Sequence, residues 1–157
     1  ADWDTLDIKT ADQVVREARD AWKAIGPVDR GGFKRVSDRY HAALDVLVKH
    51  VRKLREDNLQ HKQGLLTQAE ALMSEEVELG RAMDGIRELQ AQWRQIGPGP
   101  RRTEQQVWKR FQRAGDAVFA RRNAQRDAIK KEQQAGVAER EAICERLQTL
   151  LAGIDTV

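Results

Sequence analysis

The sequence predicts an all-α protein, built as antiparallel helical bundles or coiled-coil repeats. Three observations predict this class. Charged residues make up 34% of the 157-residue chain and aromatic residues 5%, a composition typical of long helices and not of sheets. The second half of the chain repeats the first at an interval of about 71 residues. Apolar residues recur in steps of three and four, which is the spacing of a helix that buries one face.

The internal repeat is the strongest of the three observations. Residues 3–48 align with residues 74–119 without a gap, and the phrase WKAIGPV at Trp22 returns as WRQIGPG at Trp93. Self-similarity at a fixed interval is the signature of helical arrays. We therefore expect a first helical unit at residues 1–73 and a second at residues 74–157, each with a short helix followed by a long one.

The first short helix is expected at about residues 11–25. The stretch TADQ, which starts at Thr10, has the form of a capping box, in which the threonine hydroxyl accepts a hydrogen bond from an unpaired amide. Gly26 can take the left-handed conformation that ends many helices, and Pro27 cannot continue one. The same pattern places the short helix of the second unit at about residues 82–96.

The repeated phrase also predicts buried side chains. Trp22 and Ile25 stand three residues apart in the last turn of the first short helix, and Trp93 and Ile96 repeat them in the second. Residues at this spacing share a helix face. We expect all four to be buried, and each Trp→Ala change to cost about 3–5 kcal/mol of unfolding free energy.

The first long helix is expected at about residues 33–73. Its apolar residues follow a heptad seam. They are Tyr40, Leu44, Leu47, Val51, Leu54, Leu65 and Leu72. A continuous helix would be about 60 Å long and would be shared by two neighbouring bundles, as in spectrin-like arrays. A break between Asn58 and Gly64 is the alternative.

The second unit continues differently. A capping box at Thr103 predicts a long helix at about residues 104–134. Polar residues interrupt its apolar pattern, so we expect a less well packed helix or a hinge at 120–136. A trailing amphipathic helix is expected at about 138–152. It resembles residues 65–73 after an insertion of several residues.

No pattern in the sequence predicts catalysis. His41, His50 and His61 are nine and eleven residues apart, whereas two histidines that bind zinc from one helix stand four apart. Cys144 is the single cysteine, with apolar neighbours that indicate a structural thiol. We expect no enzyme, no catalytic or metal-binding residue, no cofactor and no small-molecule substrate.

The charges are strongly segregated along the chain. Residues 101–131 carry ten Arg or Lys and three Asp or Glu, while residues 70–90 carry two Arg and six Asp or Glu. A cationic helix face can follow a phosphate backbone, which gives salt-sensitive binding of nucleic acid. The candidate residues are Arg102, Lys109, Arg110, Arg113 and Arg121. The alternative is a solvated face, or one that pairs with the acidic segment.

The repeated motif resembles a bacterial helical-repeat family, domain of unknown function 349, over residues 3–123. The second copy carries the pattern at Trp93, Ile96, Gly97, Pro98, Arg101, Trp108, Phe111, Ala114, Asp116, Phe119 and Arg122. The first copy carries it at Trp22, Ile25, Gly26, Pro27, Arg30, Tyr40, Ala43 and Asp45, and departs from it at Ser37, where the family favours Trp. The resemblance implies an all-helical, multi-repeat protein of the bacterial cytoplasm, and it implies no activity.

These observations favour a non-catalytic module that acts as a scaffold or adaptor. Its partner would be another protein, or a second copy bound through helical faces. Binding of RNA, the ribosome or DNA through the basic face is the alternative, and a small-molecule or metal site within the bundle is a distant third. No apolar run predicts membrane insertion, and the cysteine content fits the cytoplasm. Because the chain begins at Ala1 and not at Met, we expect it to be a piece of a longer protein.

Overall fold

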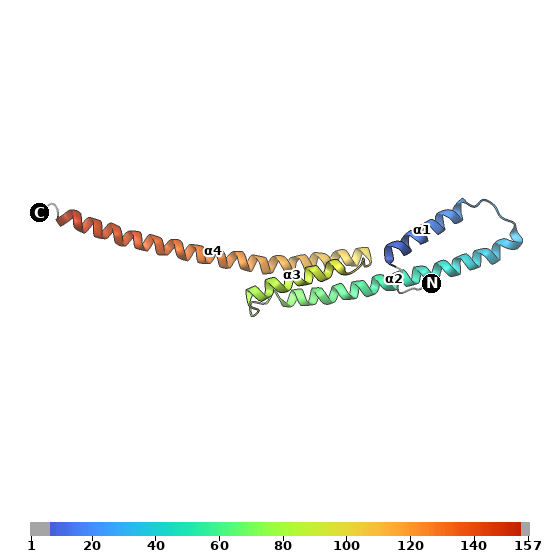
Figure 1. The fold of residues 1–157 in the computed structure, drawn as a ribbon, viewed down its shortest axis with the longest axis horizontal. Helices are drawn as coiled ribbons and strands as arrows, with labels where there is room; N and C mark the ends of the chain where they lie inside the picture. Colours follow the sequence, from blue (N-terminus) through green and yellow to red (C-terminus); the bar gives the residue numbers. More distant parts are fainter. Residues whose placement is uncertain (1–6, 155–157) are drawn as a thin grey trace.

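The computed structural model describes residues 7–154, and all its regular structure is helical (Figure 1). The outermost ends of the two expected units, residues 1–6 and 155–157, lie outside the described residues. The elements are α1 (Ile8–Ala24), α2 (Arg30–Ala71), α3 (Leu79–Gln95) and α4 (Arg101–Ile154). They form an elongated rod in which α1 folds back on α2, while α3 lies against both α2 and α4. The all-α class is confirmed, and so is the order of short and long helices.

The start of α1 differs from the prediction. Asp7 caps the helix, because its Oδ1 accepts a hydrogen bond from the Thr10 amide at 3.0 Å and its Oδ2 accepts one from the Thr10 hydroxyl at 2.7 Å. The bond from the Thr10 hydroxyl, followed by the one from its amide, lowers the pKa of Asp7. The capping box predicted at Thr10 is therefore wrong. Both residues are good caps, and the aspartate one turn earlier takes the role.

The start of α4 also lies earlier than predicted. The helix begins at Arg101, directly after Pro100, and Thr103 lies inside its first turn. Glu104 reaches back from this turn and accepts a hydrogen bond from the Gly99 amide at 2.9 Å. The predicted cap at Thr103 is therefore wrong. The carboxylate of Glu104 satisfies an amide of the preceding loop, as an acidic side chain near a helix start commonly does.

The repeated Gly-Pro ends both short helices without a left-handed residue. The backbone leaves α1 and α3 through Ile25 and Ile96, both in the extended region. Among the described residues no glycine has a positive φ, so the predicted left-handed caps at Gly26 and Gly97 are wrong. A proline forces the residue before it toward extended conformations, which explains why each glycine continues an extended exit.

Both long helices are continuous. The 42 residues of α2 span about 63 Å, so the alternative break between Asn58 and Gly64 does not occur. The 54 residues of α4 span about 81 Å. The trailing helix expected at 138–152 is therefore part of α4, and 120–136 is an exposed stretch of helix and not a hinge. Ala, Arg, Gln and Lys dominate this stretch and favour helix, whereas one interior glycine costs only about 1 kcal/mol.

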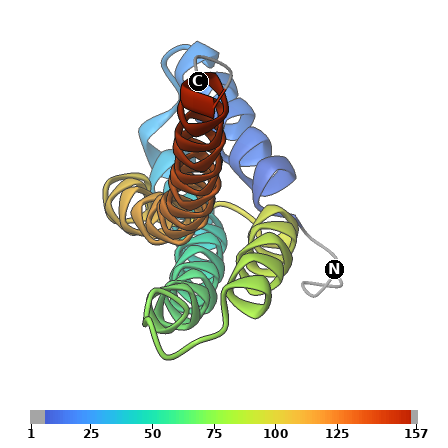
Figure 2. The ribbon, with the colours of Figure 1, turned by 90° about the vertical axis from the view of Figure 1, so that its left-hand side faces the viewer.

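The main core lies in the middle of the rod, where the end of α2, α3 and the start of α4 form a three-helix bundle. Its buried members are Leu65, Leu66, Ala69, Ala82, Ile86, Leu89, Trp93, Val107, Phe111, Ala114 and Val118. A smaller core joins α1 to α2 through Ile8, Ala11 and Val51. Viewed along the rod, α2, α3 and α4 surround the main core (Figure 2).

The first copy of the repeated phrase is less buried than the second. Trp93 is 8% exposed, whereas Ile25 is 62% exposed and Trp22 is half-buried. Trp22 stacks on Tyr40, with ring centroids 4.1 Å apart. Burial is confirmed for Trp93, is only partial for Trp22 and Ile96, and is wrong for Ile25. The first copy is more exposed because α1 packs on α2 alone while α3 packs on two helices.

Candidate interaction surfaces

Three of the five predicted cationic residues lie on the outer face of α4. Lys109 and Arg113 follow Arg102 by seven and eleven residues, so both point within about 20° of the direction of Arg102. That direction is opposite to the buried Val107 and Phe111. All three are exposed, and none forms an ion pair with another residue in the part of the chain that the structure describes.

The other two predicted cations form hydrogen bonds with other parts of the same chain. The Arg110 guanidinium donates from Nε and Nη2 to Glu70 Oε1 of α2, at 3.1 and 2.7 Å. Arg121 donates to the carbonyl oxygens of Ser74 and Val77, at 2.9 and 3.1 Å, and so fastens the turn between α2 and α3. Sequence reasoning could not separate these residues from their neighbours, because their partners belong to a distant part of the sequence.

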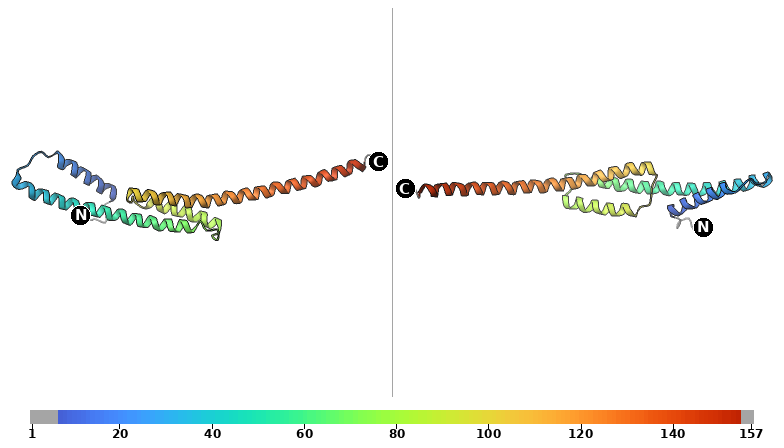
Figure 3. Two further views of the ribbon diagram at one scale, coloured as in Figure 1. Left: turned by 180° about the vertical axis from the view of Figure 1, so that it is seen from behind. Right: turned by 90° about the horizontal axis from the view of Figure 1, so that it is seen from above.

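The second candidate surface is on the part of α4 that extends beyond the bundle. We call residues 122–154 the α4 arm. It continues as a single helix at the end of the rod opposite to the α1–α2 hairpin (Figure 3). No side chain of the α4 arm is buried, and α4 contacts other helices only through its first half.

The α4 arm nevertheless carries an apolar stripe. The arm stripe consists of Ile143, Leu147, Leu150, Leu151 and Ile154. These side chains are 56–70% exposed. At about 100° per residue they fall on the side of α4 that faces the core further back along the helix. An exposed apolar surface of this kind is a candidate interaction site.

The arm stripe repeats the end of α2, where α3 packs. Lys62-x-x-Leu65-Leu66 in α2 corresponds to Arg140-x-x-Ile143-Cys144 in the α4 arm. This alignment is one heptad longer than the one that pairs Trp22 with Trp93, and a heptad rotates a helix face by only about 20°. Leu65 and Leu66 are buried, whereas their counterparts are exposed. The arm therefore presents the face that receives a short helix in the central bundle.

Lys62 is a buried residue that sequence reasoning missed. It is 3% exposed, its Nζ donates to a carboxylate oxygen of Glu104 in α4, and it lies 5.3 Å from the centroid of the Trp93 ring in α3. One side chain thus links all three helices of the bundle. The signal in the sequence is that Lys62 lies beside the heptad seam, four residues after Asn58 and three before Leu65, and so on the same side of the helix.

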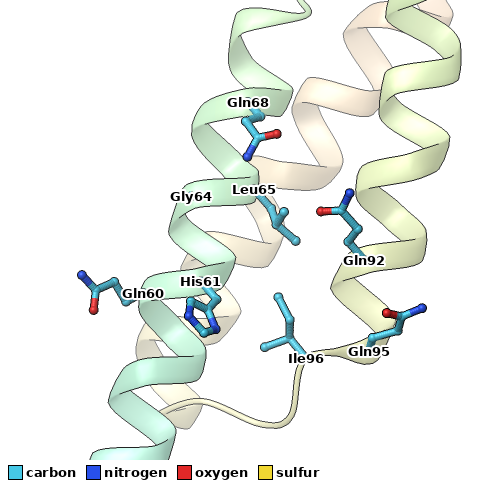
Figure 4. Close-up of a pocket in the computed structure, with 8 residues that line it drawn as sticks. All are labelled: Gln60, His61, Gly64, Leu65, Gln68, Gln92, Gln95 and Ile96. Carbon is cyan, nitrogen blue, oxygen red and sulfur yellow. The ribbon is translucent and has the colours of Figure 1, made fainter.

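A groove between α2 and α3 is lined by apolar side chains together with glutamines (Figure 4). Its volume is about 500 Å³. The lining residues are Gln60, His61, Gly64, Leu65, Gln68, Gln92, Gln95 and Ile96. Leu65 and Ile96 point toward the space between the helices, and Gln60 points away from it. His61 is the one titratable side chain in the lining, so the groove can hydrogen-bond a ligand but offers little charge to orient it.

The fold and these surfaces define a helical-repeat protein with one complete bundle, an open hairpin and a bare helical arm. Residues 32–102 and 106–156 match the family model described as Domain of Unknown Function (DUF349). The chain belongs to this family, and the resemblance inferred from Trp-x-x-Ile-Gly-Pro is confirmed. Neither the curated proteins nor the solved structures contain a match. Within residues 7–154, no helix is both long enough and apolar enough to cross a bilayer.

Proposed function

We propose that this chain is a non-catalytic helical adaptor of the cytoplasm, which holds a protein partner through the α4 arm. The observation that carries the proposal is the arm stripe, five apolar residues on one face of a helical arm in which no side chain is buried. The rest of α4 buries the same face against α2 and α3.

The energetics support a partner at this surface. Burying one Leu or Ile side chain contributes about 1.5–3 kcal/mol, so five of them supply on the order of 10 kcal/mol before the costs of association. An isolated helix gains none of this, and helices in proteins are stabilised mainly by packing of their apolar face. Binding of a partner to the arm stripe would therefore stabilise the arm.

The non-catalytic part of the proposal rests on how the reactive side chains are placed. His41, His50 and His61 all belong to α2, nine and eleven residues apart, which is too far for two of them to act on one atom. Cys144 is exposed on the arm, so the structural thiol expected from its apolar neighbours is wrong, and the three histidines that could activate a thiol all belong to α2. The acidic Glu78 accepts hydrogen bonds from two backbone amides and serves as the cap of α3.

Partner capture tests the proposal. The tagged chain should capture a protein partner from bacterial lysate, and the double variant Leu147→Glu/Leu151→Glu should lose it, because each change places a charge within the arm stripe. The matched control is Ala138→Glu/Ala142→Glu, which adds the same charge to the outer face of the same arm. Equal capture by both double variants would refute the role of the arm.

A second candidate function, binding of nucleic acid, is favoured by the three exposed cations Arg102, Lys109 and Arg113. Contacts with about three phosphates predict weak binding of duplexes at low salt, with a slope of log K against log salt near about −2.7. Reversing all three to Glu should abolish a gel shift. A control that reverses Arg122, Arg126 and Lys130, on another side of the helix, should retain it. Equal shifts for both variants would exclude this face as the binding site.

A further inference from the structure

The two ends of the rod are incomplete in complementary ways. In the central bundle, α3 lies between two long helical segments, the end of α2 and the start of α4. Among residues 7–154, α1 at one end of the rod packs on α2 alone, and the α4 arm at the other end has no helix against it (Figures 1 and 3). The α1–α2 hairpin thus corresponds to α3 and the start of α4 in the central bundle, and the α4 arm corresponds to the end of α2.

The open side of the α1–α2 hairpin is visible when repeat positions are compared. Val36 is 47% exposed, whereas its counterpart in the second copy, Val107, is 6% exposed. Ala43 is likewise exposed, and its counterpart Ala114 is buried. We use the name α1–α2 face for the exposed or half-buried residues of the first copy whose counterparts in the second copy lie at or beside the main core. They are Val14, Trp22, Ile25, Val36, Tyr40, Ala43 and Val48, with Trp22 and Tyr40 half-buried.

Val14 shows which segment is missing from this face. Its counterpart is Gly85, and a Cβ atom built on Gly85 would lie 2.7 Å from Leu72 Cδ1 at the end of α2. Position 14 therefore faces the place that the end of a preceding long helix would occupy, and Val14 is 46% exposed there. In the alignment that pairs Leu65 with Ile143, the counterpart of Leu72 is Leu150, a member of the arm stripe.

The side chains at the two ends also match in size and charge. The arm has Leu147 where the central core has Ala69, and α1 has Ala18 where α3 has Leu89, so a larger residue in the arm is offset by a smaller one in α1. Residues 30–53 of α2 carry seven Arg or Lys and two Asp. Residues 132–154 of the arm carry two Arg and four Glu. Opposite net charges favour encounter of the two surfaces.

We propose that the partner of the α4 arm is a second copy of this chain, bound head to tail. The arm stripe of one copy lies on the α1–α2 face of the next, parallel to the start of α2, and completes a three-helix bundle like the central one. This inference rests on the proposed function and names the partner of the same surface. Because the contact joins two different surfaces, it leaves a free arm and a free face at the ends, and the assembly grows with concentration.

Sedimentation velocity on the purified chain tests the inference. The weight-average sedimentation coefficient should rise from about 1 µM to about 500 µM. The arm variant Leu147→Glu/Leu151→Glu and a face variant, Val36→Glu/Ala43→Glu, should each lower the association constant at least about tenfold, since a charge enters an apolar contact. The control Ala138→Glu/Ala142→Glu should associate as the unmodified chain does. Far-UV circular dichroism should show that all variants remain helical.

Mixing the two variants gives the sharpest result. The arm variant keeps an intact face and the face variant keeps an intact arm, so an equimolar mixture should form 1:1 dimers and stop there. An unmodified chain that stays monomeric at all concentrations would overturn the inference. Association of the face variant at unmodified strength would also overturn it, because that result indicates arm-to-arm pairing. If the chain stays monomeric but captures a partner through the arm stripe, this inference fails and the proposed function stands; loss of both results overturns both.

Discussion

Trp93 is the side chain on which the three helices of the central bundle converge. Its ring centroid lies 4.7 Å from that of Phe111 and 5.2 Å from that of Trp108, both on α4, and the Lys62 ammonium lies over it. Trp93→Ala should lower the unfolding free energy by about 3–5 kcal/mol. Trp22→Ala, at the same position of the first copy, should cost about half as much, because one helix covers it instead of two. Urea denaturation followed by circular dichroism measures both, and equal losses would contradict this account.

Lys62 and Glu104 form an ion pair that is closed off from solvent on the lysine side. Lys62→Met keeps most of the packing volume but leaves the carboxylate without its cation, and should cost about 2–3 kcal/mol. The double variant Lys62→Met/Glu104→Gln should cost less than the sum of the two single changes by at least about 1 kcal/mol. Urea denaturation of the four proteins of the cycle gives this coupling energy. Additive losses would show that the two side chains do not depend on each other.

At the scale of the element, the start of α3 makes stability depend on pH. Glu78 accepts hydrogen bonds from the amides of Arg81 and Gly80, at 2.9 and 2.8 Å, and these bonds lower its pKa. A carboxylate with a lowered pKa stabilises the folded state above its ordinary pKa, and this contribution disappears as the pH falls through the folded value. The urea concentration at the midpoint of unfolding should therefore decrease as the pH is lowered from about 5 to about 3. Glu78→Gln should remove part of this slope, and an unchanged slope would exclude the cap as its source.

The interior of α2 can be made more stable by a single methyl group. Gly64 is an exposed residue inside α2, about two turns before its end, and nothing lies within 4 Å of a Cβ atom built on it. Gly64→Ala should raise the unfolding free energy by about 0.5–1 kcal/mol, since Ala loses less backbone entropy in a helix. Gly97→Ala is the contrasting change, because its Cβ would lie 2.8 Å from Asn58 Nδ2, and a shift of this amide breaks its hydrogen bond to the Pro98 carbonyl. Thermal denaturation should show opposite shifts of the midpoint for the two variants.

The sequence predicted the order of the elements but not their ends. Helical spacing and proline act over a few residues, so the repeat and the Gly-Pro stops could be found without a structure. The cap at Asp7 was missed because Thr10, one turn later, is an equally good candidate. The length of α4 was missed because the prediction relied on a regular apolar pattern. Polar residues interrupt this pattern at the start of the α4 arm, where the helix packs on nothing and continues all the same.

The candidate surfaces were predicted less completely than the fold, for a related reason. The basic face was found by counting charges along one helix, and that count cannot show that Arg110 and Arg121 bind α2 and the turn after it. Lys62 was not among the predicted residues, because its partners, Glu104 and Trp93, belong to other helices and are distant in the sequence. The arm stripe was visible in the sequence, but its exposure depends on which helices pack against α4.

At the scale of the whole molecule, exposure of apolar side chains increases from the middle of the rod toward both ends. The central bundle buries its apolar residues, the α1–α2 face leaves the equivalent positions open, and the α4 arm buries none. Packing therefore stabilises the middle of the rod, and the two ends gain comparable packing only when another molecule binds to them. Local opening of the arm should therefore cost little free energy in the dilute chain, in keeping with its lack of buried contacts.

Amide hydrogen exchange at two concentrations shows whether the α4 arm of one copy covers the α1–α2 face of another. At about 1 µM the amides of residues 136–154 should exchange quickly, while those of α3 stay protected. At about 500 µM exchange should slow in residues 136–154 and in residues 30–48 together, because the arm of one copy covers the face of the next. Exchange that is independent of concentration in both segments, or an arm that is already protected when dilute, would contradict the account.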